Sequence, residues 1–137
     1  MPVINLHSRI IGDEYSEDLV ILHGLLGSAD NWQTLAKRYA IDFRVHLLDA
    51  RNHGRSPHSE EHTYEAMSED LLEYLDTHSI EKANLLGHSM GGKTVMMFTE
   101  KHPDRVSKLI VADIAHREYT PHHELIFKAL QSTNPAS

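Results

Sequence analysis

Short apolar runs alternate along the chain with segments of helical periodicity. The apolar runs are typical of β-strands and cover residues 2–11, 18–23, 43–50, 82–88 and 107–113. The segments with helical spacing lie between them, at 31–40, from 65 onwards and at 90–102. In the segment from 65 onwards the apolar face is expected to hold Met67, Leu71, Leu72 and Leu75, and the opposite, polar face to hold most of Glu65, Glu69, Asp70 and Glu73. Strands that alternate with helices predict a mostly parallel sheet with right-handed crossovers and helices on both faces, so the predicted fold class is α/β.

The composition is that of one globular domain. The chain has 137 residues, of which 40% are hydrophobic and 24% charged, and no apolar run approaches the roughly 20 residues that span a bilayer. It opens without a signal-peptide pattern and contains no cysteine, so we expect a cytoplasmic protein without a membrane partner. The net charge of -7 argues against nucleic acid as a partner. The 12 histidines are scattered without a metal-binding motif, and neither a metal ion nor another cofactor is expected.

The stretch LLGHSMGGKT, residues 85–94, matches two catalytic templates. As G-x-S-x-G it is a nucleophile elbow, a strained turn between a strand and a helix that presents Ser89 for acyl transfer. As G-x-x-x-x-G-K-T, Gly87 to Thr94, it is a phosphate-binding loop with Lys93 on a nucleotide. In that alternative, Asp113 after the last apolar run would hold magnesium with Thr94. Both templates need a strand before the loop and a helix after it, so the rest of the chain must decide.

Residues that follow an earlier strand favour the elbow. His23 and Gly24 come directly after the run at 18–23, and a glycine there lets the chain turn so that the backbone N–H of Leu25 can face a developing oxyanion. The N–H of Met90, at the start of the next helix, would be the second donor.

The glycines of the loop have a steric explanation in the same interpretation. Gly87 and Gly91 flank the strained turn, where side chains would have no room. Gly92 and Lys93 are then ordinary residues of the first helical turn. Met90, Met96, Met97 and Phe98 are expected in the core.

Four stretches together resemble the α/β-hydrolase superfamily, specifically its small bacterial esterases and thioesterases that act on acyl-CoA and simple esters. These stretches are HGLLGSADNW at 23–32, DARNHGRSP at 49–57, GHSMGG at 87–92 and VADIA at 111–115. The resemblance implies a small-molecule ester or acyl thioester substrate, Ser89 as the nucleophile, Leu25 and Met90 as oxyanion donors, and Asp113 as the acid of the triad.

The loop after the second long strand also matches the family. The resemblance implies that Asp49, His53, Gly54 and Ser56 brace the elbow by hydrogen bonds, with direct substrate contact as the alternative. His88 is expected in support of the same turn. It lies beside Ser89 but on the opposite side of a tight turn, so it is not expected to act as the base.

The family's catalytic histidine lies on a loop after the last strand of a longer chain. The resemblance therefore predicts that residues 1–118 form the N-terminal part of a hydrolase core, that 119–137 begin a cap, and that a second chain or fragment could supply the rest. The run at 107–113 would then be an uncovered apolar sheet edge. Three histidines are less favoured as a local base, namely His116, His122 and His123. A non-catalytic hydrolase-like module is a further alternative.

Overall fold

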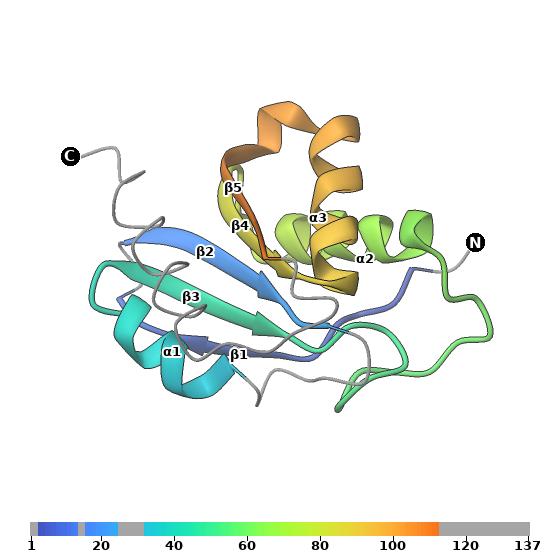
Figure 1. Cartoon of the computed structure of the whole chain (residues 1–137), viewed down its shortest axis with the longest axis horizontal. Helices are drawn as coiled ribbons and strands as arrows, with labels where there is room; N and C mark the ends of the chain where they lie inside the picture. Colours follow the sequence, from blue (N-terminus) through green and yellow to red (C-terminus); the bar gives the residue numbers. More distant parts are fainter. Residues whose placement is uncertain (1–2, 14–15, 25–31, 113–137) are drawn as a thin grey trace.

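Five strands form a single sheet with the order β1-β3-β2-β4-β5. The computed structural model describes residues 3–13, 16–24 and 32–112. The strands are β1 (Ser8–Ile11), β2 (Glu17–Leu22), β3 (Phe43–Leu48), β4 (Ala83–His88) and β5 (Val106–Ala112). The helices are α1 (Gln33–Tyr39), α2 (Tyr64–Thr77), α3 (Met90–Lys101) and the 3-10 turn η2 (Pro103–Arg105). Strands and helices alternate as the sequence predicts (Figure 1).

The sheet is mostly parallel. Strand β2 pairs in parallel with β3 and β4, and β4 pairs in parallel with β5, whereas β1 runs antiparallel to β3. Only the end of the apolar run at 2–11 is a strand. Two backbone N–H groups before it bond to side chains instead of a neighbouring strand: Ile4 donates to the Asp70 carboxylate at 2.8 Å and His7 to the Ser56 hydroxyl at 2.8 Å.

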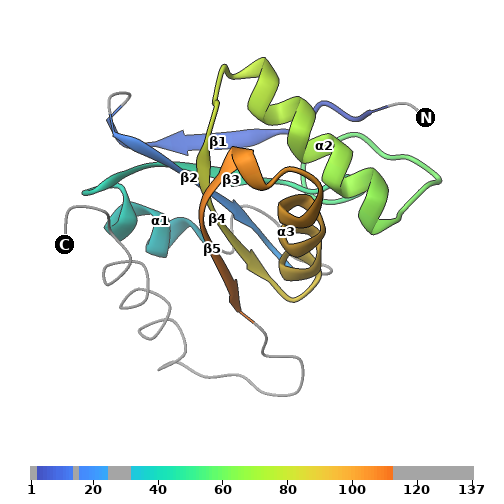
Figure 2. The same cartoon turned by 90° about the horizontal axis from the view of Figure 1, so that it is seen from above.

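Helices cover both faces of the sheet, with α1 on one side and α2 and α3 on the other (Figure 2). The central strand β2 alternates between them. Leu19 and Ile21 pack in a core cluster with the buried side chains of α1, and Val20 and Leu22 pack in a second cluster with those of α2 and α3. This burial on both faces is what an uninterrupted apolar run predicts.

Helix α2 begins at a side-chain cap. The Thr63 hydroxyl accepts a hydrogen bond from the Ala66 N–H at 3.0 Å, which satisfies one of the free donors of the first turn. Met67 and Leu71 are buried as their spacing predicts. Asp70, which the same periodicity places on the polar face, is buried as well, and this part of the prediction is wrong.

An ion pair explains the burial of Asp70. The Arg51 Nε lies 2.7 Å from Asp70 Oδ2 and Nη2 lies 2.9 Å from Oδ1, and each side chain is only 1% exposed. Arg51 also donates to the Glu61 carbonyl at 2.9 Å. Because Ile4 donates to Asp70 too, this pair joins the N-terminal segment, the loop after β3 and helix α2.

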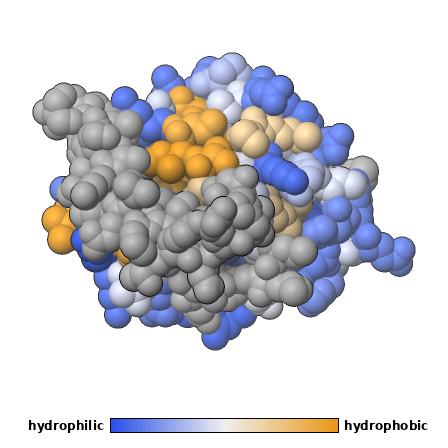
Figure 3. Space-filling model, in the orientation of Figure 1, coloured by the Kyte–Doolittle hydropathy of each residue, from blue (hydrophilic) through white to orange (hydrophobic). Residues whose placement is uncertain are grey.

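Strand β5 lies at one side of the sheet and, among the described residues, pairs only with β4. Leu109 and Val111 are 38% and 39% exposed, and Figure 3 shows an apolar surface over this strand. Met96 on α3 is 43% exposed, so its prediction as a core residue is wrong, whereas Phe98 is fully buried. No helix within the described ranges is both long and apolar enough to cross a membrane.

Candidate active site

Ser89 occupies a strained turn between β4 and α3. Its backbone has φ 56 and ψ -110, a left-handed conformation that costs a residue with a side chain roughly 1–3 kcal/mol. The Ser89 N–H donates to the Ala112 carbonyl at the end of β5 at 2.9 Å, and the Ser89 carbonyl accepts from the Lys93 N–H at 3.1 Å. The backbone is therefore fixed on both sides, and the side chain stays partly exposed.

The glycines around Ser89 allow backbone segments to touch. A Cβ on Gly87 would lie 2.3 Å from the Gly91 carbonyl oxygen, and a Cβ on Gly91 would lie 2.3 Å from the Leu22 carbonyl oxygen. A Cβ on Gly92 would lie 2.9 Å from Cγ1 of Val111. Gly92 is thus in close contact with β5 and is not the ordinary helix residue that the sequence interpretation made it.

The chain between β2 and α1 approaches Ser89 from a second side. A Cβ on Gly24 would lie 2.9 Å from Nδ1 of His88. The His88 ring also lies edge-on to Trp32, with 5.8 Å between ring centroids. Leu25, the predicted first oxyanion donor, lies outside the described residues. Met90, the predicted second donor, opens α3, where a backbone N–H has no carbonyl to bond within the helix.

His23 ties this segment to the loop after β3. Its Nδ1 lies 2.7 Å from the Gly24 carbonyl, which can only accept, so Nδ1 carries the proton. Nε2 then accepts from the Ala50 N–H at 3.0 Å. Burial lowers the pKa of His23, although the Gly24 carbonyl opposes this shift. His23 is therefore a neutral positioning side chain with both nitrogens engaged.

The loop after β3 is held by its own polar groups. Asp49 accepts from the Arg55 N–H at 3.1 Å and contacts His7 Nδ1 at 3.1 Å. Gly54, with φ +50, lies close to the side chain of Asp49, and a Cβ on Gly54 would collide with the Asp49 carboxylate. The Ser56 hydroxyl donates to the Asp49 carbonyl.

His53 connects this loop to the segment after β2. Its Nδ1 lies 2.9 Å from the Arg51 carbonyl, and its ring centroid lies 5.2 Å from that of His23. These contacts fix the loop that His23 in turn joins to Gly24, and the bracing of the elbow by this loop stays a prediction.

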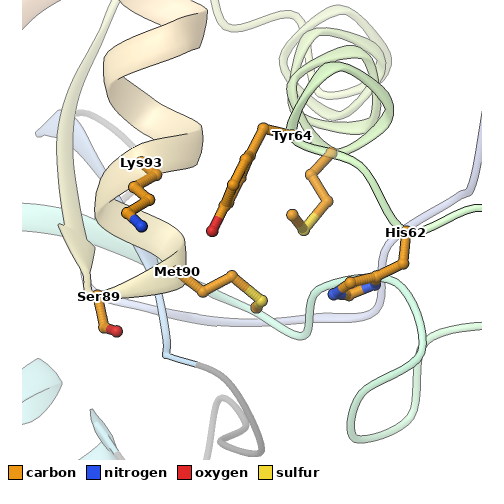
Figure 4. Close-up of a pocket in the computed structure, with 6 residues that line it drawn as sticks. His62, Tyr64, Ser89, Met90 and Lys93 are labelled. Carbon is orange, nitrogen blue, oxygen red and sulfur yellow. The ribbon is translucent and has the colours of Figure 1, made fainter. Parts of the chain in front are cut away.

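A pocket of about 280 Å³ opens beside Ser89 (Figure 4). Its lining residues come from the start of α2, the loop before it and the start of α3, and they are His62, Tyr64, Met67, Ser89, Met90 and Lys93. The Lys93 Nζ lies 5.8 Å from the centroid of the Tyr64 ring. The sequence analysis did not name His62 and Tyr64, and it gave Lys93 a ligand-binding role only in the phosphate-binding alternative. Of the three, only Lys93 had a local signal, its place four residues after Ser89 in the same loop.

The same geometry counts against the phosphate-binding interpretation. Thr94 is fully buried, and its hydroxyl bonds to the Met90 carbonyl at 3.1 Å. The same hydroxyl lies 3.9 Å from Met67 Sδ, so it is buried between protein groups and is not open to a magnesium ion. Asp113, its predicted partner, lies outside the described residues. Across residues 3–13, 16–24 and 32–112, no three His, Asp or Glu side chains are grouped so that they could hold a metal ion.

Several predicted site residues cannot be placed. Asp113 and the alternative bases His116, His122 and His123 lie outside the described residues, as does the predicted cap segment 119–137. Their roles stay predictions.

Comparisons with known proteins agree on one family. Residues 19–132 match the family described as the alpha/beta hydrolase fold. The esterase YbfF of Escherichia coli is 38% identical over 133 residues, which cover 96% of this chain and 52% of that protein. An sn-1-specific diacylglycerol lipase of Mus musculus is 46% identical over 117 residues, which cover 84% of this chain and 38% of the lipase.

A solved structure adds the same likeness in three dimensions. A marine microorganism esterase superposes with a TM-score of 0.79 and 48% identity, over 96% of this chain and 52% of that chain. The chain spans about half the length of this esterase and of the Escherichia coli protein.

Proposed function

The chain belongs to the α/β-hydrolase fold family, and we propose that it acts as a serine hydrolase on carboxylic esters. The observation that carries the proposal is the strained turn at Ser89, which stands at the start of α3 and at the edge of a pocket. The names of similar proteins, esterase and lipase, support the same reaction class.

In the proposed reaction, the Ser89 oxygen attacks the carbonyl carbon of the ester. A bond forms between them, the carbonyl oxygen becomes negative, and the alcohol leaves with a proton as the tetrahedral species collapses. The N–H groups of Met90 and Leu25 would stabilise the oxyanion, and Asp113 would orient the histidine that takes the serine proton. Water then releases the acid from Ser89.

The substrate is proposed to be a small molecule, and an acyl thioester would fit the same mechanism with a thiol as the leaving group. A cytoplasmic location and the absence of nucleic acid and membrane partners are part of the same proposal. A second chain or fragment that supplies the histidine is also part of the proposal, and His116, His122 and His123 are the less favoured local alternatives.

Covalent labelling with a fluorophosphonate tests the proposal, because the reagent reacts with an activated serine. Labelling of the parent protein and loss of labelling in Ser89→Ala are expected. Ser107→Ala, an exposed serine on β5, is the matched control and should label like the parent. Equal labelling of Ser89→Ala and the parent would show that Ser89 is not the nucleophile.

Hydrolysis of a short activated ester separates an enzyme from a non-catalytic module of the same fold. Turnover that Ser89→Ala abolishes supports the proposal. Titration with ATP and magnesium checks the phosphate-binding alternative, for which we expect no binding in either the parent or Lys93→Ala.

A further inference from the structure

Lys93 has no part in the acyl-transfer steps, yet it lies beside the reacting serine. It follows Ser89 by four residues, its N–H bonds to the Ser89 carbonyl at 3.1 Å, and both residues line the same pocket. Figure 4 shows the Lys93 side chain reaching toward the Tyr64 ring, and Ser89 just before the start of the same helix. The distance of 5.8 Å from Nζ to the ring centroid lies within the range of a cation–π contact.

The pocket lining is positively biased. Lys93 brings an ammonium group, His62 brings an imidazole, and none of the lining residues that the structure describes is a carboxylate. Tyr64 and Met90 are the first residues of α2 and α3, so two helix N-termini with positive dipole ends also border this space. This bias is local, because the whole chain carries a net charge of -7.

The remaining walls are apolar and adaptable. Met67 and Met90 contribute thioether side chains, which fill irregular spaces, and Tyr64 contributes an aromatic face. A ligand that matches this pocket has an apolar portion against these residues and a negative charge near Lys93. Lys93 is itself exposed, so water screens the attraction between its ammonium group and the charge of a ligand. We therefore expect Lys93 to change the preference among substrates by a modest factor.

We propose that Lys93 makes the enzyme prefer esters that carry an anionic group, a carboxylate or a phosphate, close to the bond that is cleaved. The inference rests on the proposed function of Ser89. Ser89 and Lys93 line the same pocket and are joined by the hydrogen bond from the Lys93 N–H to the Ser89 carbonyl, so the charge must lie close to the ester carbonyl to meet the Lys93 ammonium. The charge can stand on the acyl side or on the alcohol side of the ester.

Two matched pairs of substrates test this preference in the natural protein. For the acyl side, p-nitrophenyl hydrogen succinate is compared with its methyl ester. For the alcohol side, 4-acetoxybenzoate is compared with its methyl ester. In each pair kcat/KM is measured for the parent, Lys93→Met and Lys93→Arg. For each protein, kcat/KM for the anionic ester is divided by kcat/KM for the neutral ester. This ratio is then compared between variant and parent, so that the intrinsic reactivity of the two esters cancels.

We expect Lys93→Met to lower this ratio by about three- to tenfold in at least one pair, because a charge pair near the protein surface has a strength of that order. Lys93→Arg should keep the ratio. Lys101→Met, which removes an exposed lysine at the far end of α3, is the matched control and should leave it unchanged. Raising the ionic strength should weaken the preference of the parent and leave Lys93→Met unaffected.

The outcomes separate the inference from the proposed function. If hydrolysis depends on Ser89 but Lys93→Met changes both members of each pair equally, the role of Lys93 is refuted and the hydrolase stands. If Ser89→Ala hydrolyses these esters like the parent, the proposed function itself fails. If Lys93→Met does not fold, two other results would still overturn the inference. One is a preference of the parent for anionic esters that does not respond to ionic strength. The other is loss of that preference in Lys93→Arg.

Discussion

The buried ion pair between Arg51 and Asp70 offers a sharp test of what stabilises the fold. Asp70→Asn keeps the side-chain size and an oxygen that can accept from the Ile4 N–H, but removes the negative charge that faces Arg51 at 2.7 Å and 2.9 Å. The carboxylate raises the pKa of the Arg51 guanidinium by its hydrogen bonds, so Arg51 stays charged. The substitution therefore removes the carboxylate that pairs with a charged group of which only 1% of the side chain meets water.

Breaking a buried pair in this way costs about 3–5 kcal/mol. That is a large share of the roughly 5–15 kcal/mol by which domains are stable. Equilibrium urea denaturation followed by circular dichroism measures the loss of unfolding free energy. We expect the urea midpoint of Asp70→Asn to be lower than that of the parent. The double variant Arg51→Met with Asp70→Asn should lose less unfolding free energy than the sum of the losses in the two single variants.

Asp76→Asn is the matched control on the same helix. Asp76 also pairs with an arginine, Arg105, at 2.9 Å, but its side chain is 57% exposed. Water screens such a pair, and its loss should cost about 0–1 kcal/mol. Equal losses for Asp70→Asn and Asp76→Asn would refute the argument that burial, and not the ion pair as such, sets the cost.

Two further predictions follow from the same structure. Gly91→Ala should cost about 2–3 kcal/mol or more and reduce labelling of Ser89, because its Cβ would collide with the Leu22 backbone. Gly92→Ala should cost less, since its Cβ would meet the Val111 side chain at 2.9 Å and the Gly87 carbonyl oxygen only at 3.3 Å. Denaturation and phosphonate labelling of both variants check this, and equal losses would contradict it. Burial lowers the pKa of His46 below the 6.5 of an unfolded histidine, so stability should be fully present above pH 6.5 and fall as the pH drops below it, by about 1.4 kcal/mol per pH unit until His46 itself takes up a proton. Urea denaturation of the parent and His46→Gln between pH 7.5 and 5.5 checks this, and identical pH slopes would contradict it.

Local patterns predicted the elements well because their causes are local. The run at 18–23 is apolar at every position that faces a helix layer, and the strand β2 follows it closely. The spacing of Gly87 and Gly91 around Ser89 likewise predicts a crowded turn, and the structure has one. The predicted family is confirmed by the match to the family model, and the predicted sheet by the observed strand order and pairing.

What the sequence could not predict depends on contacts between distant segments. Asp70 has the helical position of an exposed acid, and its burial depends on two distant partners, Arg51, 19 residues away, and the Ile4 N–H. His62 and Tyr64 line the pocket because α2 begins beside the start of α3, which no periodicity reveals. Met96 is exposed because its apolar side chain lies on the helix face that no described residue covers, and hydrophobicity alone does not distinguish the two faces.

The geometry at Ser89 is a consequence of strand register. The parallel pairing sets Leu22 opposite Gly87 and His88 opposite Ala112. This register brings the Ala112 carbonyl to the Ser89 N–H and the Leu22 carbonyl against Gly91, so three strands together hold the left-handed turn in place. A slip of one residue in either pairing would remove these contacts and leave nothing to offset the strain at Ser89. The position of the proposed nucleophile is therefore set by the topology of the sheet as much as by the G-x-S-x-G sequence.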